Sequence, residues 1–360
     1  APVPAPGPPC MPLPACRTYL PPEWAPQSGV LLTWPHARSD WAPILHKVEP
    51  VFTAIAAAIA RHEMVLVACH DETVRTQVAA RLRSAGIPDA RVRLFVAPAN
   101  DTWARDHGPI TVLCQNEATL LDFGFNGWGG KYAHDLDNLI THQLYTQGAF
   151  GDAPLETVDL ILEGGSIEVD GQGTLLTTTR CLLTPTRNPG RTRAQIETEL
   201  AALLGLTRFL WLEHGYLAGD DTDSHIDTLA RLCDASTIAY VACDDPADEH
   251  YAELQAMERE LQAFRTAAGQ PYRLVALPWP RPRFDDDGAR MPATYANFLI
   301  INGAVLVPTY DDPADRLALE RLRDCFPERE VIGIDCLPLI YQHGSLHCVT
   351  MQIPAEVLPA

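Results

Sequence analysis

One cysteine, one histidine and three carboxylates occupy comparable places along this 360-residue chain. His225 and Asp227 stand two residues apart in GDDTDSHIDTLAR, where an apolar run that predicts a strand begins. Side chains at positions i and i+2 of a strand point to one face, so the pair is expected to project together. Cys348 lies in another predicted strand, and Asp106 and Glu163 each start a predicted hairpin. An isolated His-x-Asp pair is more often a structural hydrogen-bonded pair at a strand edge than a catalytic pair. Five polar residues at matched positions, however, are not typical of side chains that only pack in a core.

The chemistry that suits this set depends on the charge of the substrate. A cysteine attacks as its thiolate, which cationic neighbours stabilise. Carboxylates around Cys348 would oppose the thiolate, unless the substrate is itself a cation. A guanidinium meets both demands, because it is always charged and carboxylates bind it through paired hydrogen bonds. The set therefore predicts a thiol hydrolase for a guanidino compound.

The elements that must position these groups recur along the chain. A hairpin, a helix and a strand repeat about five times, at a spacing of roughly 55–80 residues. The hairpins are expected at 108–125, 166–178, 226–241 and 295–308. A last apolar strand at 345–353 has no hairpin partner and is expected to pair with 29–34 and close a ring. Equivalent places in successive units of a ring face its axis, so the polar groups should converge at one end of a central channel.

This repeat predicts an α/β fold, a five-bladed propeller that forms a single domain over 23–360. Residues 1–22 are rich in proline and are expected to be extended or disordered. The proline-rich segment 278–292 is expected to be a long surface loop and not a domain boundary.

Composition narrows the classes of partner. The chain has 46 acidic and 27 basic side chains and a formal charge of −19, which argues against nucleic-acid binding. No apolar run approaches the ~18–20 residues that span a bilayer, and no secretory leader is visible. The ten cysteines lack C-x-x-C spacing and fit reduced cytosolic thiols better than disulfides or a zinc site. A cytoplasmic protein with no membrane or nucleic-acid partner is expected.

Four motifs together resemble those of the agmatine deiminases. They are WxRDxGP at 103–109, LEGGSIxVDGxGTLLTT at 162–178, GDDTDSHIDTLAR at 219–231 and GSLHCVT at 344–350. The agmatine deiminases belong to the guanidino-modifying pentein superfamily, which also holds arginine deiminases and bacterial peptidylarginine deiminases. The likeness runs from about Leu20 to Pro354. It implies a five-bladed α/β propeller, in agreement with the repeat.

The resemblance also implies a role for each candidate catalytic residue. Cys348 is the expected nucleophile and His225 the general acid and base. Asp106 and Asp227 would hold the guanidinium nitrogens, with Glu163 orienting the histidine or the substrate. The implied reaction converts agmatine to N-carbamoylputrescine and ammonia through a covalent thiouronium, as in putrescine biosynthesis. No metal or organic cofactor is implied, and a homodimer is expected.

Other residues have weaker assignments. Trp103, Trp128 and Asp221 could line the substrate pocket, although a packed loop aromatic explains Trp128 equally well. Asp221 belongs to an acidic run that would suit the second cation of agmatine, and turn formation explains that run equally well. Arg105 is expected to be a buried ion-pair partner and His347 a structural residue.

Three alternatives stay open at this level. A deiminase of free or peptidyl arginine would use the same chemistry, and the segment His343-Gly344-Ser345, where one branch of the family has three glycines, leaves substrate preference undecided. A metal hydrolase could use His225, Asp227, Asp106 and Glu163 as ligands of a divalent ion. A propeller that only binds a partner would not need Cys348.

Overall fold

The structure, a computed structural model, describes residues 16–358, and the remainder of the predicted tail lies outside them. Its strands are β1 (Thr18–Tyr19), β2 (Gln27–Thr33), β3 (Met64–Cys69), β4 (Val92–Val96), β5 (Ile110–Cys114), β6 (Glu117–Gly124), β7 (Leu155–Ile161), β8 (Glu168–Val169), β9 (Thr174–Thr178), β10 (Arg208–Leu212), β11 (Ala230–Asp234), β12 (Thr237–Val241), β13 (Arg273–Leu277), β14 (Arg283–Phe284), β15 (Arg290–Met291), β16 (Leu299–Ile301), β17 (Ala304–Thr309), β18 (Glu330–Asp335) and β19 (Thr350–Pro354).

The α-helices are α1 (Leu45–Ala60), α2 (Glu72–Ser84), α3 (Ala104–His107), α4 (Gly127–Gly130), α5 (Ile140–Thr146), α6 (Thr179–Leu182), α7 (Arg193–Leu204), α8 (Tyr251–Ala263) and α9 (Asp315–Cys325). Short 3-10 helices are η1 (Ala42–Ile44), η2 (Asp89–Arg91), η3 (Asp137–Leu139), η4 (Gly164–Ser166), η5 (Ile226–Thr228), η6 (Leu339–Gln342) and η7 (His347–Val349).

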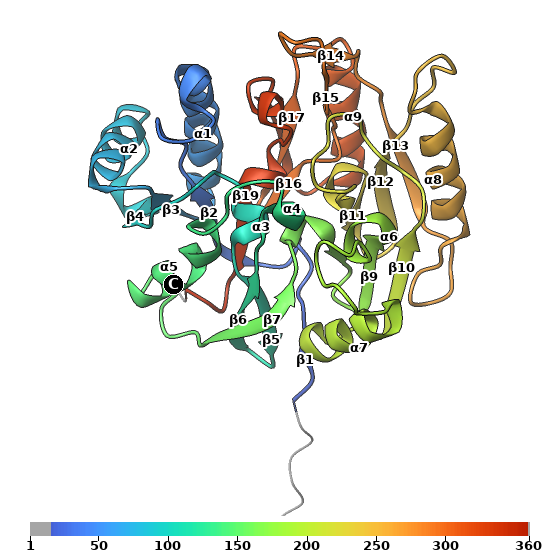
Figure 1. Ribbon diagram of the computed structural model, residues 1–360, viewed down its shortest axis with the longest axis horizontal. Coiled ribbons are helices and arrows are strands. Elements are labelled where there is room, and N and C mark those ends of the chain that lie inside the picture. The colour runs from blue at the N-terminus through green and yellow to red at the C-terminus, as the bar shows by residue number, and fades with distance from the viewer. Residues whose placement is uncertain (1–15, 359–360) are drawn as a thin grey trace, which may run out of the picture.

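One strand pattern recurs in five sheets. Each contains an antiparallel pair followed by a parallel pair, in the orders β5-β6-β7, β8-β9-β10, β11-β12-β13, β16-β17-β18 and β19-β2-β3. The last unit joins the two ends of the chain, because β19 pairs with β2 as predicted. Helices α1, α2, α7, α8 and α9 lie at the periphery, while α3, β16 and β19 lie toward the middle (Figure 1).

Helix α7 shows how local sequence sets the boundaries of a peripheral element. The Thr192 side chain accepts from the backbone N–H of Gln195, and the Gln195 side chain accepts in return from the N–H of Thr192. At the other end Gly205 adopts φ 67°, a left-handed conformation that favours glycine. Asn188, four residues before Thr192, binds the backbone of Ile161.

Residues Ala42–Ala60 form the one helix in the described part of the chain that is long and apolar enough to cross a membrane. A core helix of a soluble protein meets the same criterion. The face of α1 that carries Val51, Phe52 and Ile55 is buried in the largest hydrophobic cluster of the protein. This helix is therefore weak evidence for a membrane span.

Order begins earlier than predicted. β1 lies inside the segment 1–22 and pairs antiparallel with β5, with Thr18 opposite Cys114. A disulfide joins Cys16 to Cys114, so the prediction that the cysteines are uniformly reduced is wrong for this pair. The other seven cysteines of the described chain are free and buried. The pairing provides partners for backbone groups that a disordered tail would leave in water.

Two predicted strands begin later than the sequence suggested. His225 and Asp227 do not lie on a strand, because η5 occupies Ile226–Thr228 and β11 starts at Ala230. Cys348 lies in η7 and not in the closing strand, which starts at Thr350. The predicted 278–292 loop also contains the small β14–β15 hairpin.

Candidate functional site

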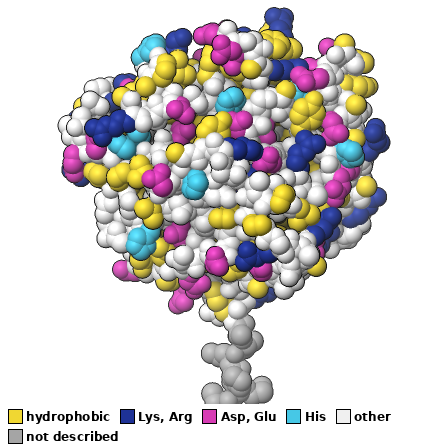
Figure 2. All heavy atoms as spheres, viewed as in Figure 1, with side chains coloured by type: hydrophobic (Ala, Val, Ile, Leu, Met, Phe, Trp, Pro, Cys, Tyr) yellow, Lys and Arg dark blue, Asp and Glu magenta, His cyan; other side chains and the backbone are white. Residues whose placement is uncertain are grey.

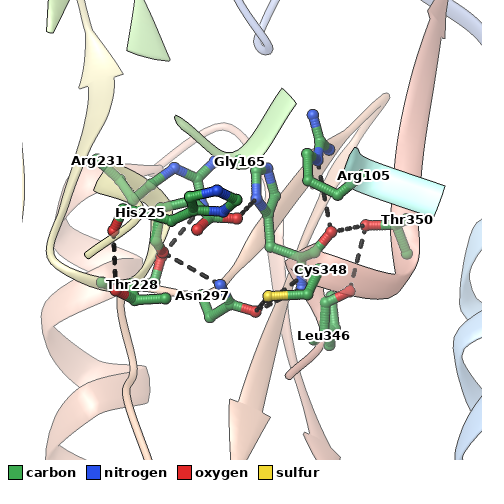
Figure 3. Close-up of polar contacts among 12 residues, drawn as sticks. Arg105, Gly165, His225, Thr228, Arg231, Asn297, Leu346, Cys348 and Thr350 are labelled. Carbon is green, nitrogen blue, oxygen red and sulfur yellow. Dashed lines mark hydrogen bonds and ion pairs between the residues drawn. The ribbon is translucent and has the colours of Figure 1, made fainter. Parts of the chain in front are cut away.

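The candidate nucleophile lies on a turn between two core elements. Cys348 is buried, and its Sγ is 3.4 Å from Oδ1 of Asn297 (Figure 3). The same oxygen accepts from the backbone N–H groups of His347 and Cys348 at 2.9 and 3.3 Å. Asn297 therefore fixes the turn that presents the thiol, although no sequence motif marked it.

The histidine and two aspartates predicted to act together converge beside Gly165. A methyl group added to that glycine would lie 2.6 Å from His225 Nδ1, 2.8 Å from Asp106 Oδ1 and 3.0 Å from Asp227 Oδ2. His225 Nδ1 is 3.7 Å from Asp106 Oδ1. Only glycine leaves space for three polar side chains to meet there. The predicted convergence is correct, but it arises from turns and not from alternation along a strand.

Buried charge shifts the protonation of this group. Burial raises the pKa of the Cys348 thiol well above its usual range, and Asp227 and Asp106 raise it further. Burial lowers the pKa of His225, but Asp106, Cys181 and Glu163 outweigh it and raise the pKa well above the ordinary value. The pKa of Asp106 rises to about 6, chiefly through burial. The resting site therefore favours a neutral Cys348 thiol and a protonated His225.

Glu163 lies on the other side of the histidine and is fixed by an arginine. Glu163 Oε1 is 3.7 Å from His225 Nε2 and accepts from Arg187 Nε at 2.8 Å. Arg187 also pairs with Asp223 at 2.7 Å. Burial raises the pKa of Glu163, but His225 and Arg187 outweigh it and bring the pKa below its usual value. An ionised Glu163 can thus orient and charge His225, as the motif implied.

One trio of described residues brings three possible metal-ligand atoms within 4.8 Å of one another, and its members are Glu163, Cys181 and His225. It differs from the set expected for a metal hydrolase, since Cys181 replaces both aspartates. The guanidinium of Arg187 already neutralises Glu163. The trio therefore forms an acid–base pair, His225 and Glu163, with the thiol of Cys181 beside it.

A cavity opens beside Cys348 and Asp106. Its other lining residues are Asp101, Trp103, Trp128, Tyr132, Asp220, Asp221, Thr222, Thr228, Gln342, His343 and Gly344. Four of the residues predicted to bind substrate thus border one space. Asp227 and Glu163 do not line it and lie deeper. A cation in this cavity would meet carboxylates and aromatic rings.

The aromatic residues of this cavity have defined roles in its wall. Trp128 Nε1 donates to Asp106 Oδ2 at 2.9 Å, so Trp128 holds the predicted guanidinium ligand and is more than a packed loop aromatic. The Trp103 ring packs on Gly344, where an added methyl group would lie 2.1 Å from ring carbon Cζ3. Gly344 thus sets the position of one wall.

Asp221 lies at the exposed mouth of the cavity and is held there by several contacts. Its Oδ2 accepts from Tyr132 Oη at 2.5 Å and is 3.7 Å from His343 Nε2. Lys131 donates to the backbone oxygen of Asp221 and pairs with Asp223 at 2.9 Å. Tyr132, Lys131 and the proximity of His343 to Asp221 were not anticipated from the sequence. The mouth therefore carries both acidic and basic groups.

Behind the site lies a buried network that the sequence did not reveal. His347 Nδ1 lies 2.8 Å from Asp227 Oδ2, and its Nε2 lies 2.7 Å from Glu23 Oε2. Arg231 pairs with Glu23 at 2.9 Å. Arg105 is buried and 3.9 Å from Glu23, as expected of an ion-pair partner. His347, which was expected to be a structural residue, contacts a predicted catalytic carboxylate directly.

The surface is consistent with a small-molecule site. On the face shown in Figure 2, acidic and basic side chains are interspersed and form no continuous basic patch. The chain carries a formal charge of −19. Neither feature favours a polyanionic partner.

A family model and the sequences of known proteins both match nearly the whole chain. The family described as Porphyromonas-type peptidyl-arginine deiminase matches residues 19–354. The agmatine deiminase of Stutzerimonas stutzeri (strain A1501) is 35% identical over 360 residues, which cover 94% of this chain and 95% of that protein.

Solved structures extend the likeness to three dimensions. A Porphyromonas gingivalis protein, provisionally named an arginine deiminase, is 53% identical with a TM-score of 0.88, over 95% of this chain and 99% of that chain. The agmatine deiminase of C. jejuni with substrate bound is 37% identical with a TM-score of 0.86, over 93% and 96%. An amidinotransferase from Microseira wollei shares only the fold, at 12% identity and a TM-score of 0.50. These neighbours are consistent with the α/β pentein fold.

Proposed function

The chain belongs to the Porphyromonas-type peptidyl-arginine deiminase family, and on that premise we propose that it is an agmatine deiminase. Such an enzyme hydrolyses agmatine to N-carbamoylputrescine and ammonia, and so acts on a carbon–nitrogen bond of a linear amidine. Agmatine deiminases among its relatives and solved neighbours support this assignment, as the motifs predicted. One observation carries it: a buried thiol shares an acidic, aromatic-walled cavity with groups suited to a guanidinium.

Substrate binding follows from the two aspartates. Asp227 Oδ1 is buried and lacks a hydrogen-bond partner among the described residues, so it can accept from a guanidinium nitrogen. Asp106 offers a second carboxylate beside Cys348. A guanidinium held by both cancels the negative charge that raises the pKa of the Cys348 thiol. Thiolate then forms when substrate is bound, with the thiol proton released to solvent.

The chemical steps use Cys348 and His225. The thiolate attacks the central guanidinium carbon and forms a tetrahedral adduct. His225, which is protonated at rest, donates its proton to one terminal nitrogen as the carbon–nitrogen bond breaks and ammonia leaves. The product of this half-reaction is an S-alkylthiouronium on Cys348. Neutral His225 then takes a proton from water, the hydroxide attacks the same carbon, and collapse expels the Cys348 thiolate. The hydroxyl proton leaves to solvent, giving the carbamoyl product.

We propose further that the five sheets are blades arranged around one axis. The shared strand pattern and the β19–β2 pairing of the chain ends support this arrangement. The single domain over 23–360, the homodimer and the cytoplasmic location expected from the sequence remain predictions.

The activity is tested by measuring ammonia release from agmatine, arginine, putrescine and an arginyl peptide side by side. Agmatine should give the highest kcat/KM, and putrescine should be inert because it has no guanidinium. Preincubation with a chelator should leave the rate unchanged. A chelator-sensitive rate would favour the metal-hydrolase alternative, and a higher kcat/KM for arginine would overturn the substrate assignment.

Deimination of free or peptidyl arginine is a second candidate. The name given to the P. gingivalis neighbour, at 53% identity, favours it. In addition, Lys131 lies at the mouth, where a substrate carboxylate would need a cation. Lys131 is already paired with Asp223, however, and the adjacent carboxylate of Asp221 suits an ammonium better. Agmatine is therefore preferred.

A further inference from the structure

Consecutive residues of the site face opposite sides. Asp106 and Cys348 line the cavity proposed for substrate, whereas Arg105 and His347 line a second cavity behind them. Glu23 also borders this rear cavity. Helix α3 and turn η7 thus form a partition, and a side chain on its rear face can act on the chemistry at its front.

His347 bridges two carboxylates across this partition. Its Nδ1 is 2.8 Å from Asp227 Oδ2, and its Nε2 is 2.7 Å from Glu23 Oε2. An ionised carboxylate can only accept a hydrogen bond. Burial alone would raise the pKa of both acids. Arg231 and His347 nevertheless bring the pKa of Glu23 well below its usual range, and His347 lowers the pKa of Asp227. The His347 ring therefore joins the two buried carboxylates through both of its nitrogens.

The far end of the bridge is anchored in the core. Arg231 binds Glu23 and Glu168, each at 2.9 Å, and donates to the backbone oxygen of Ala296 at 3.1 Å. The other oxygen of Glu23 accepts from the backbone N–H of Ile300 at 2.7 Å. Because Arg231, Glu23 and His347 are buried, this chain of contacts has one arrangement and not many.

The near end leaves one oxygen of the catalytic carboxylate unused. Asp227 Oδ2 is tied back to His347, while Oδ1 is buried and has no partner among the described residues. We propose that His347 is a positioning residue of the deiminase: its ring, held between Glu23 and Asp227, fixes the plane of the Asp227 carboxylate and keeps Oδ1 available to the guanidinium. The proposal rests on the proposed function.

Loss of the His347 ring has a predictable effect on pH dependence. The charged and titratable groups around Asp227 and His347 are Glu23, Arg105, Asp106, Glu168, His225, Arg231 and Cys348. Asp227 binds substrate only when ionised. Without its hydrogen bond to His347, the pKa of Asp227 rises, so more alkaline conditions are needed for binding. The acid limb of kcat/KM should therefore move to higher pH.

The test compares His347→Gln with His250→Gln. His250 is a matched control, since it is also buried and bonded to a carboxylate, Asp248, at 2.7 Å, but it lies away from both cavities that flank the partition. His347→Gln should raise KM for agmatine by about ten- to hundredfold, the cost of one charge-assisted contact. It should also move the acid limb upward. His250→Gln should lower Tm without either change.

A second measurement does not depend on activity or on folding of a variant. Histidine ring NMR spectra of the wild-type protein should show a slowly exchanging ring N–H of His347, because the buried ring lies between two carboxylates. A His347 ring N–H that exchanges as fast as that of an exposed histidine would overturn the proposal, as would an unchanged KM and acid limb in His347→Gln. If the wild-type protein deiminates no guanidino substrate, the proposed function fails, while the exchange rate still decides whether the His347 ring is held.

Discussion

Asp106→Asn removes one guanidinium-binding charge while keeping the size of the side chain. Both oxygens of Asp106 are acceptors in the structure: Oδ1 from the N–H of Gly165 at 3.1 Å and Oδ2 from Trp128 Nε1 at 2.9 Å. An asparagine has one acceptor oxygen, so its NH₂ group must face one of these donors. The variant therefore loses a charge and one supporting hydrogen bond.

The expected magnitude has two parts. A hydrogen bond to a charged group is worth about 1.5–3 kcal/mol, so KM for agmatine should rise about ten- to 150-fold. The asparagine also removes a negative charge that raises the pKa of Cys348, so the free thiol should become easier to ionise. Steady-state kinetics measure the first effect, and the rate of alkylation of Cys348 by neutral iodoacetamide measures the second.

A buried aspartate in a turn provides the control. Asp170 accepts from the N–H groups of Gln172 and Thr174 at 2.7 and 3.0 Å, and it borders neither cavity of the site. Asp170→Asn should lower Tm and leave KM and thiol reactivity alone. The reasoning is refuted if Asp106→Asn lowers kcat with KM unchanged, or if Cys348 becomes less reactive.

Three further changes test separate parts of the structure. Gly344→Ala should lower kcat/KM by at least about tenfold with little loss of Tm, because the methyl group displaces the Trp103 ring; an unchanged kcat/KM would show that this wall does not contact substrate. Asp221→Asn should cut kcat/KM about ten- to hundredfold for agmatine but little for butylguanidine, which lacks the amine, and equal losses would mean that Asp221 only supports the loop. Burial raises the pKa of Glu63 to about 7, so the native state holds a proton that the unfolded chain has lost, and stability present at pH 4 declines as the pH rises through 7. Glu63→Gln should flatten that decline in Tm between pH 5 and 8, and a parallel decline would contradict it.

The parts of the fold that local pattern controls could be predicted from the sequence. The hairpin expected at 295–308 is present as β16 and β17, and its turn is Asn302-Gly303, with Gly303 at φ 71°. The errors fall in short apolar runs, where a 3-10 turn and a strand have similar composition. The turns η5 and η7 are such cases, and they carry Asp227 and Cys348.

The candidate site also contains residues that the sequence predicted and residues that it did not. Cys348, His225 and the acidic residues stood out because they occupy matched positions in the predicted repeat. The supporting residues did not, since their partners are far away in sequence: Glu23 and His347 are 324 positions apart. Asn297, 51 positions before Cys348, lies in no polar motif that would mark it. Only tertiary structure brings such pairs together.

The central claim is that Cys348 forms a thiouronium with the guanidino carbon, and acid-quenched turnover followed by intact-mass and peptide mass spectrometry tests it most directly. Enzyme quenched during turnover of agmatine should carry a covalent adduct equal in mass to the substrate less ammonia, on the peptide that contains Cys348. Cys348→Ser should give neither adduct nor turnover while keeping the wild-type Tm. An adduct on another cysteine, or turnover by Cys348→Ser above a few per cent of wild type, would contradict the account.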